Sequence, residues 1–380
     1  MVKQIVNPYE VKGSIDYDKL VDEFGVSKIN NKLLNEIEKN VGELHFLLRR
    51  GYFFSHRDLD KLLKRYSKGE KFVLYTGRGP SGSTTIGHLL SWVFTKWLAD
   101  KFDVKTYFQI TDDEKFLFNP NLNLTETNKL AYEAALDFIA LGFKEENLDV
   151  IVNTNAADIL YPVAIRIAKK LTLSSVKASM GFNDSSNIGI NFYTAMQSVP
   201  VFLESIRQKK NVPVLIPYGI DQDNHFRLTR DVAEKLGFLK PFTINCKFMP
   251  GLKSNDGKMN ASDPNSAIYT TDDEKTVINK IKKAQTGGRE TITEQKKLGG
   301  RPKECNVYSY YDLFFEPDDN KLKTIYSNCV GGSLLCGECK LMLANKVNVF
   351  LKKHQIERHK AKSKLKNYFL KKDFDTIRID

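Results

Sequence analysis

The chain has 380 residues, enough for two or three domains with a sizeable buried core, and its 41% hydrophobic content excludes disorder throughout. No run approaches the roughly 18 apolar residues of a membrane span, and the first residues lack a signal peptide's apolar region, so we expect a cytoplasmic protein without membrane contact. A formal net charge of +12 indicates polyanionic partners.

The first part of the chain carries helical patterning. Apolar residues recur at helical spacing within residues 15–24 and 30–39. At Lys71 the pattern changes to a short apolar strand, Phe72–Tyr75, followed by a glycine-rich turn and a helix over Ile86–Trp97. Residues 1–67 are therefore predicted to form an N-terminal extension.

A second strand, Lys105–Ile110, completes a β-loop-α-β unit, which predicts parallel pairing with a right-handed crossover. Further strands are expected at 149–152 and 212–217, and helices at 129–141 and 226–236. This alternation predicts an α/β fold, with a Rossmann-type doubly wound parallel sheet over residues 68–270. Beyond that, helical patterns dominate, so residues 271–380 are predicted to form a separate all-α domain with a C-terminal tail.

The positive charge is concentrated in this last region. Residues 275–303 carry nine Lys or Arg against two Glu, and residues 351–372 carry nine against one. Five scattered cysteines are an odd number, so reduced thiols are expected. Cys336 and Cys339 have the spacing of a zinc knuckle, but no second pair lies at a matching distance. No structural zinc, and no other protein-bound metal, is expected.

The turn over Gly77–Gly82 matches the dinucleotide fingerprint Gly-x-Gly-x-x-Gly, which on its own would fit an oxidoreductase. The match is weak, because Asp103, the residue at the ribose-binding spacing, lies before the second strand. The helix start Thr85-Ile-Gly87-His88 favours another use. A bare glycine there lets an adenine ring approach the backbone, and a histidine on the first turn can donate to phosphate oxygens.

A second element, Lys258-Met-Asn-Ala-Ser262, lies in a polar loop near the end of the expected sheet. A lysine on such a loop can offset the charge that develops as pyrophosphate leaves. In this order the two elements resemble the signature motifs of class I aminoacyl-tRNA synthetases. Further strings extend the likeness to tryptophanyl-tRNA synthetases of the eukaryotic and archaeal type: Tyr75-Thr-Gly-Arg-Gly-Pro80, Thr111-Asp-Asp-Glu-Lys115, Gly219-Ile-Asp-Gln-Asp223 and Ser262-Asp-Pro-Asn-Ser266.

The resemblance implies a homodimer with a Rossmann-type catalytic domain, an inserted dimerisation segment and a helical anticodon-binding domain. It implies that L-tryptophan is activated with ATP and Mg²⁺ and transferred to tRNA(Trp). The implied catalytic residues are Thr85, His88 and Lys258. The implied ATP site is Thr76, Gly77, Arg78, Gly87, Asp221, Met259 and Ser262. The implied tryptophan site is Tyr75, Gln109, Glu114, Gln197 and Gln222.

The chemistry of tryptophan agrees with these roles. An indole offers one N–H donor, for which the oxygens of Tyr75 or Gln109 can supply an acceptor. Glu114 supplies the charge complementary to an ammonium group.

Two alternatives stay open on sequence grounds. The first is a tyrosyl-tRNA synthetase, although we find no aspartate to pair with a phenol opposite Gln109. The second is a catalytically relaxed, RNA-binding relative, because Thr85 stands where a histidine is frequent and Asn260 where a serine is usual.

Overall fold

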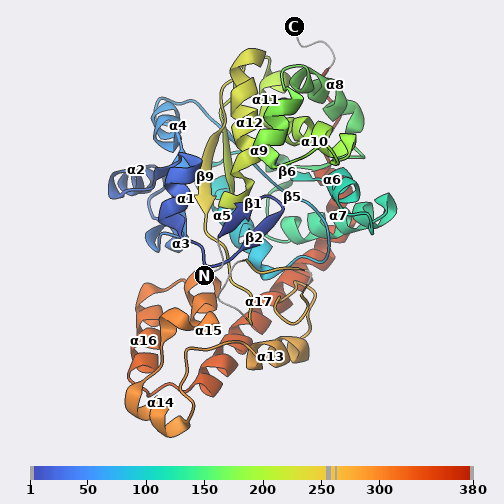
Figure 1. The fold of residues 1–380 in the computed structure, drawn as a ribbon. Coiled ribbons are helices and arrows are strands. Elements are labelled where there is room, and N and C mark those ends of the chain that lie inside the picture. Colours follow the sequence, from blue (N-terminus) through green and yellow to red (C-terminus); the bar gives the residue numbers. More distant parts are fainter. Residues whose placement is uncertain (1–3, 254–257, 262, 377–380) are drawn as a thin grey trace.

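A computed structural model describes residues 4–253, 258–261 and 263–376. Its upper part is built on a seven-stranded sheet in the order β3-β4-β9-β8-β5-β6-β7, and its lower part is a separate group of helices (Figure 1). Five neighbouring strands of the sheet are parallel: β5 (Val73–Arg78), β6 (Thr106–Ile110), β7 (Leu148–Val152), β8 (Val214–Gly219) and β9 (Phe242–Cys246). The prediction of a doubly wound parallel sheet is confirmed.

Alternation along the strands divides the core between the two faces of the sheet. In β5, Leu74 faces a cluster that includes α5 (Ile86–Phe102) and α7 (Leu124–Ile139), whereas Val73 and Tyr75 face the opposite cluster. That second cluster is covered by α8 (Ala157–Ala168), α10 (Ile188–Ser198), α11 (Pro200–Gln208) and α12 (Asp223–Ala233). The shorter helices α6 (Asp112–Phe118) and α9 (Leu173–Met180) complete this part.

The N-terminal extension is more than the helices that its pattern predicted. It contains α1 (Tyr17–Phe24), α2 (Asn31–Val41), α3 (Phe46–Arg49) and α4 (Leu59–Tyr66). It also supplies β3 (Ser27–Lys28) and β4 (Phe53–Arg57), and β4 pairs antiparallel with β9 at the edge of the main sheet. A separate hairpin of β1 (Ile5–Asn7) and β2 (Glu10–Lys12) crosses in front of that sheet (Figure 1).

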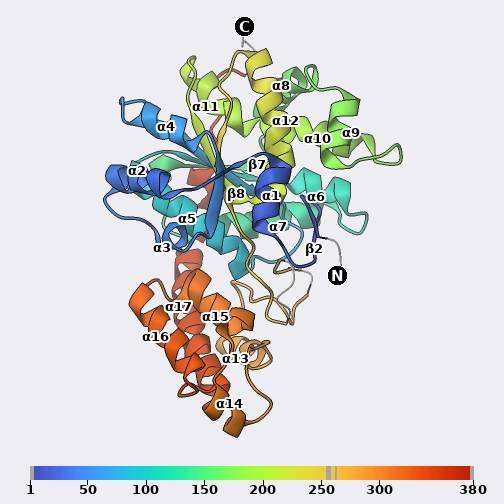
Figure 2. The ribbon, with the colours of Figure 1, turned by 60° about the vertical axis from the view of Figure 1, so that its left-hand side comes forward.

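The described residues beyond 270 form no regular strand, as predicted. Their helices are α13 (Glu274–Lys282), α14 (Ile292–Leu298), α15 (Asn306–Tyr310), α16 (Asp319–Val330) and α17 (Cys336–Lys364), with a π-helical turn at Tyr311–Phe315. The long α17 runs from this domain up to the catalytic domain (Figure 2). There His354 contacts the buried Asp137 of α7, at 3.0 Å. Among the described residues, no helix is both long and apolar enough to cross a membrane.

Candidate active site

A cavity of about 400 Å³ lies at the carboxyl ends of the parallel strands. Its walls come from the ends of β5 and β8, the start of α5, the turn before α12, the loop at 258–261 and the N-terminal hairpin. The chain leaves β5 toward β6 on one side, while β8 lies on the other. Such a switch in strand order opens the crevice in which doubly wound sheets bind their ligands.

The start of α5 fixes one protonation state of His88. The Thr85 N–H donates to His88 Nδ1 over 3.1 Å, and the Thr85 hydroxyl lies 2.9 Å from the same nitrogen. Burial, with the charges of Arg78 and Lys258 nearby, holds the His88 pKa well below its usual value. His88 is therefore neutral, with Nδ1 as acceptor, so Nε2 carries the proton and can donate.

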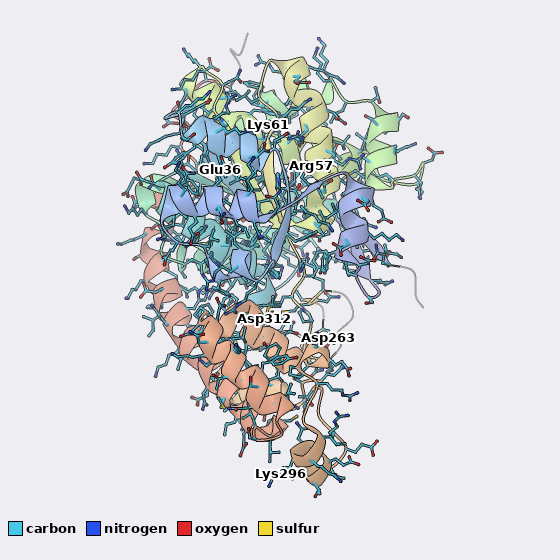
Figure 3. The ribbon with its side chains drawn as sticks, turned by 90° about the vertical axis from the view of Figure 1, so that its left-hand side faces the viewer. Glu36, Arg57, Lys61, Asp263, Lys296 and Asp312 are labelled. Atoms are coloured by element: carbon cyan, nitrogen blue, oxygen red, sulfur yellow. The ribbon has the colours of Figure 1, made fainter. Side chains whose placement is uncertain are left out.

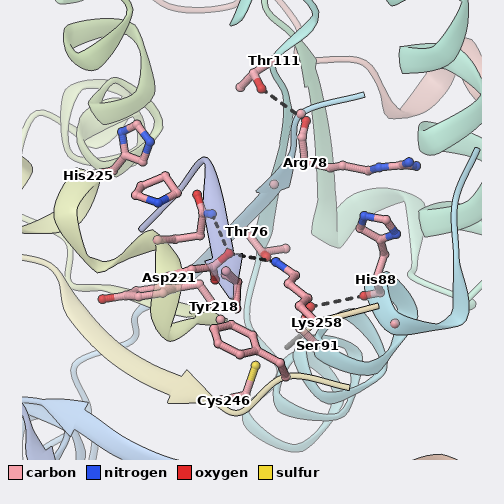
Figure 4. A pocket seen from close by; sticks show the side chains of 18 of the residues that line it. Thr76, Arg78, His88, Ser91, Thr111, Tyr218, Asp221, His225, Cys246 and Lys258 are labelled. Carbon is pink, nitrogen blue, oxygen red and sulfur yellow. Dashed lines mark hydrogen bonds and ion pairs between the residues drawn. The ribbon is translucent and has the colours of Figure 1, made fainter. Parts of the chain in front are cut away.

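Lys258 reaches across the cavity to Asp221, with Nζ 2.8 Å from Oδ2 (Figure 4). Burial disfavours the ammonium, but Asp221 outweighs it and holds the Lys258 pKa above its usual value. Gln222 donates to the same Asp221 oxygen over 3.2 Å, whereas Asp221 Oδ1 is buried without a protein partner. This corner therefore holds one charged lysine together with a carboxylate oxygen that can still accept a hydrogen bond.

The glycine-rich turn lies close against neighbouring backbone. A Cβ at Gly77 would come 2.6 Å from the carbonyl oxygen of Gln109, so no larger residue fits there. Arg78 donates to the Thr84 hydroxyl at 2.5 Å and to the carbonyl of Gly82 at 2.6 Å. Its role in this structure is to shape the loop before α5.

Hydrogen bonds to the main chain of Met259 and Ala261 also anchor the loop at 258–261. The Met259 N–H donates to the Met249 carbonyl over 2.8 Å, and the Tyr269 hydroxyl donates to the Ala261 carbonyl over 2.7 Å. The Met259 side chain lies over Gly87, where an added Cβ would be 3.3 Å from its sulfur. The two predicted nucleotide elements are thus in contact.

At the other end of the cavity, Tyr75 is the centre of a buried network. Its hydroxyl donates to Gln109 Oε1, at 2.5 Å, and accepts from Gln197 Nε2, at 2.7 Å. Gln109 is fully buried, donates onward to Asn153 over 2.9 Å and does not reach the cavity wall. Gln109 can therefore act on a bound ligand only through Tyr75.

Glu114 gives this end a negative charge. Burial works against its ionisation, but Lys115, 3.0 Å away, and the Thr111 hydroxyl, 2.8 Å away, hold its pKa below the usual value. The side chain of His225 faces the same space, and burial lowers its pKa to about 4. A buried carboxylate at a cavity wall is suited to a primary ammonium.

The hairpin closes this end of the cavity. Tyr9, at its tip, stacks on Phe118 with ring centres 4.2 Å apart and packs edge-on against His225. Periodicity could not locate Tyr9, because a two-strand hairpin of three residues each leaves no amphipathic pattern.

Most residues predicted for the site line this one cavity. They are Tyr75, Thr76, Gly77, Arg78, Thr85, Gly87, His88, Glu114, Gln197, Asp221, Gln222, Lys258 and Met259. Gln109 stands directly behind it, and Ser262 lies outside the described residues. Sequence reasoning missed Tyr193, Tyr218, His225 and Phe226, which also line the wall. Tyr193 and His225 could have been found, since each lies about one turn from a predicted residue, Gln197 and Asp221 respectively.

Comparison with known proteins agrees with this geometry. The family model for class I tRNA synthetases (W and Y) matches residues 67–352. The tryptophan–tRNA ligase of Pyrobaculum calidifontis is 51% identical over 366 residues, which covers 96% of this chain and 97% of the relative. The chain belongs to the tryptophan–tRNA ligase family. The ligase of Sulfurisphaera tokodaii is 49% identical over 96% of this chain and 94% of its own length.

Solved structures of this ligase family have the same fold. Tryptophanyl-tRNA synthetase from Plasmodium falciparum matches with a TM-score of 0.87 and 39% identity, over 96% of this chain and 98% of that one. The enzyme from Aeropyrum pernix matches with a TM-score of 0.85 and 32% identity, over 94% and 97%. The similarity extends through the N-terminal extension and the helical domain as well as the sheet.

Proposed function

We propose that this protein activates L-tryptophan with ATP, forming tryptophanyl-adenylate and pyrophosphate, and then transfers the tryptophan to tRNA(Trp). The observation that supports the proposal is a single cavity with a lysine and a neutral histidine at one end and a hydrogen-bonded tyrosine and a carboxylate at the other. Lys258, His88 and Asp221 lie at the first, and Tyr75, Gln197 and Glu114 at the second. The tryptophan carboxylate would lie between them, in reach of the ATP α-phosphate.

At the phosphate end, His88 Nε2–H would donate to phosphate oxygens held at the start of α5. Lys258 would leave Asp221 for the β- and γ-phosphates and stabilise the charge that forms as pyrophosphate departs. Asp221 would then accept from the nucleotide's ribose hydroxyls. Thr76, Gly77, Gly87 and Met259 would form the walls around the adenosine, and Ser262 would complete the loop.

Mg²⁺ would enter as part of the substrate. ATP phosphates and water supply most ligands to this ion in nucleotide enzymes. The described residues contain no group of three His, Cys, Asp or Glu side chains placed to hold a metal ion. The ion would therefore travel with the nucleotide and share its negative charge with Lys258.

At the indole end, the Tyr75 oxygen accepts one hydrogen bond, from Gln197, and has a second lone pair for the indole N–H. Glu114 would pair with the substrate's ammonium group, near Gln222. Phenylalanine offers no N–H, so it would leave this oxygen unpaired and be rejected strongly. The tryptophan names of the relatives favour this substrate over tyrosine.

The proposal includes a homodimer acting in the cytoplasm, where tRNA is used. Apolar side chains are exposed together on neighbouring helices α8 and α10: Ile188 is 88% exposed, Tyr161 56% and Ile165 43%. Tyr161 also contacts Phe192 across the two helices. Such a patch is typical of a subunit interface. Ile188→Asp is expected to shift the mass measured by light scattering from two chains to one; an unchanged dimer would place the interface elsewhere.

The test of the activity is amino-acid-dependent ATP–pyrophosphate exchange with tryptophan, tyrosine and phenylalanine in parallel. Exchange is expected with tryptophan alone, and Lys258→Ala should lower it roughly 100-fold or more. Lys253→Ala is the matched control, because Lys253 is an exposed lysine on the approach to the same loop that does not line the cavity. Exchange with tyrosine, or none with any of the three, would overturn the proposal.

A further inference from the structure

Behind Tyr75, hydrogen bonds continue away from the cavity through three more side chains. Gln109 of β6 donates from Nε2 to Asn153 Oδ1 over 2.9 Å, and Asn153 donates from Nδ2 to Asp113 Oδ1 over 2.8 Å. Asn153 directly follows β7, is 1% exposed and does not line the cavity. The bonds therefore run from the phenol that faces the cavity, through two buried amides, to a carboxylate. These four side chains form what we call the amide relay: Tyr75, Gln109, Asn153 and Asp113.

The carboxylate fixes the direction of every bond in the amide relay. The nitrogen and oxygen of an amide have nearly the same shape, so only the partners decide which way the group points. A carboxylate accepts hydrogen bonds, so Asn153 turns its nitrogen toward Asp113 and its oxygen toward Gln109. Gln109 then presents its own oxygen to Tyr75. The Tyr75 hydroxyl consequently donates to Gln109 Oε1, at 2.5 Å, and keeps a lone pair for a ligand.

This direction does not depend on whether Asp113 is ionised. Burial raises the Asp113 pKa to about 7, so part of the population carries a proton near neutral pH. Asp113 Oδ1 accepts a second hydrogen bond, from the Glu114 N–H over 2.9 Å, so a proton on this carboxyl group goes to Oδ2. Oδ1 is therefore an acceptor for Asn153 in both forms.

The main sheet sets the spacing of the two amides. Strands β6 and β7 pair in parallel, and the Asn153 N–H continues their ladder by donating to the Ile110 carbonyl over 3.1 Å. Gln109 and Asn153 thus extend from neighbouring strands. The helical domain, on which Lys296 and Asp312 are labelled in Figure 3, contributes no member of the amide relay. The relay therefore acts on the amino acid and not on tRNA.

Reversal of the Gln109 amide would close the phenol oxygen to an indole. Gln197 already donates to the Tyr75 oxygen over 2.7 Å from the other side. If Gln109 also turned its nitrogen to this oxygen, two N–H donors would occupy both lone pairs, and none would remain for a ligand N–H. Apart from Asn153, the acceptor near Gln109 Nε2 is the Met196 carbonyl, a long contact at 3.4 Å. Asn153 is thus the main group that opposes this reversal.

We propose that Asn153 is a positioning residue for tryptophan, with Asp113 as its anchor. Through Gln109, Asn153 holds the Tyr75 oxygen as the acceptor for the indole N–H. Neither Asn153 nor Asp113 lines the cavity, so both act without touching the ligand. The inference rests on the proposed function, since it assumes that an indole occupies the Tyr75 end of the cavity. It goes further by assigning the choice of the indole N–H to two residues behind the cavity wall.

The test compares two amino acids that differ at the indole nitrogen. In benzothienyl-alanine a ring sulfur, which donates no hydrogen bond, replaces the N–H of tryptophan. Titration calorimetry on the full chain gives the dissociation constant of each, and the ratio of the two isolates the bond to the N–H. Asn153→Leu removes both the acceptor for Gln109 and the donor to Asp113, so we expect the preference for tryptophan to fall about 10-fold. Affinity for the sulfur analogue should change much less.

Two replacements of Asp113 separate the direction of the bonds from packing. Asp113→Asn keeps an oxygen that accepts from Asn153 and from the Glu114 N–H, so it should retain the preference for tryptophan. Asp113→Leu lacks that oxygen and should lower the preference. Asn155→Leu is the matched control, because Asn155 is an exposed residue of the same loop and donates to the Tyr132 hydroxyl over 2.8 Å. Circular dichroism shows whether each variant is folded.

A folded Asn153→Leu protein that keeps the full preference for tryptophan would overturn the inference. An equal loss of affinity for both amino acids would overturn it too, because Asn153 would then only support the packing of the cavity. If Asn153→Leu does not fold, the two Asp113 variants decide, and equal preferences in both would count against the relay. Failure of the proposed function is distinct: the unchanged protein would then neither bind tryptophan nor show exchange with it, and the inference would fail as well.

Discussion

At the scale of single residues, Gln109 shows how a side chain that does not touch a ligand can set its recognition. Its Oε1 accepts a hydrogen bond from the Tyr75 hydroxyl, and this bond orients the phenol oxygen. Gln109→Leu removes this acceptor at nearly constant volume, so we expect the KM for tryptophan to rise about 10-fold, the equivalent of about 1.4 kcal/mol. The KM for ATP should stay unchanged. Both constants are measured by pyrophosphate exchange.

Thr106→Val is the control for this variant. Thr106 is buried in the same strand, its hydroxyl has no partner, and it stands at the end away from the cavity. It should leave both KM values as they are. A Gln109→Leu protein with an unchanged KM for tryptophan would show that Tyr75 needs no orienting partner.

His225 gives a prediction about stability and pH. Burial lowers its pKa to about 4 in the folded chain, below the unfolded value of about 6.5. As pH falls from about 6.5 to about 4, the unfolded chain takes up a proton here that the folded chain does not. Stability is therefore lost over this window. Urea unfolding at several pH values should show a shallower loss for His225→Gln than for the unchanged protein.

The comparison between variants is needed because Asp113 acts in the opposite direction. Burial raises its pKa to about 7, so the folded chain binds a proton there before the unfolded chain does. That group gains stability as pH falls through the same window. Both proteins contain Asp113. The difference between their unfolding free energies at each pH therefore reports His225 without the Asp113 contribution. Identical slopes in the two proteins would mean that His225 titrates in the fold as it does in the unfolded chain.

At the scale of elements, the N-terminal hairpin is the part of the extension that reaches the cavity. Tyr9→Ala removes the ring that stacks on Phe118 and packs against His225. We expect kcat/KM for tryptophan activation to fall about 10-fold or more, because water enters this end of the cavity. The free energy of unfolding should change by less than it does when a side chain of the core is truncated. Exchange kinetics and urea unfolding measure the two.

A complete deletion of residues 1–67 would not test the same idea. It would also remove β4, which pairs with β9 through Phe53–Arg57, and would leave β9 with an open edge. Loss of activity in that truncation could come from unfolding alone. Tyr9→Ala leaves intact the pairing of β1 with β2 and the 2.9 Å hydrogen bond from the Asp16 N–H to Gln4 Oε1. Normal exchange in this variant would therefore assign the hairpin a purely structural part.

The elements also show what the sequence could and could not predict. Strands β5, β6, β7 and β8 were found because each is a short apolar run between turn residues. Strands β4 and β9 were missed, since Phe53–Arg57 and Phe242–Cys246 mix apolar and polar residues and are fixed by pairing with partners about 190 residues away. Long-range pairing of this kind leaves little trace in a local pattern.

The site was predictable to a similar extent. Motifs located the phosphate end, because Thr85, His88 and Lys258 stand in short continuous strings. The position of Gln109 behind Tyr75, and the approach of Tyr9 to His225, depend on contacts between distant elements, and no spacing rule reveals them.

At the scale of the whole molecule, the charge of the helical domain is the feature that reaches beyond the catalytic cavity. The nine cations of residues 275–303 lie on the helical domain. The nine of residues 351–372 continue along α17, which His354 and Asp137 join to α7, and onto the catalytic domain, where Lys372 pairs with Asp158. A surface of this kind attracts phosphates along an RNA and releases their counterions. We expect tRNA affinity to fall steeply as salt rises.

The exposed pair Lys282 and Lys283, at the end of α13, makes this expectation specific. If both contact phosphates, Lys282→Ala with Lys283→Ala should lower the slope of log K against log salt by about 1.5, measured by filter binding of tRNA. Pyrophosphate exchange without tRNA should be unchanged, because neither lysine lines the cavity. Lys39→Ala, an exposed lysine of α2, should leave the slope as it is. If the slope is equally steep in the double variant, the RNA binds another face of the helical domain.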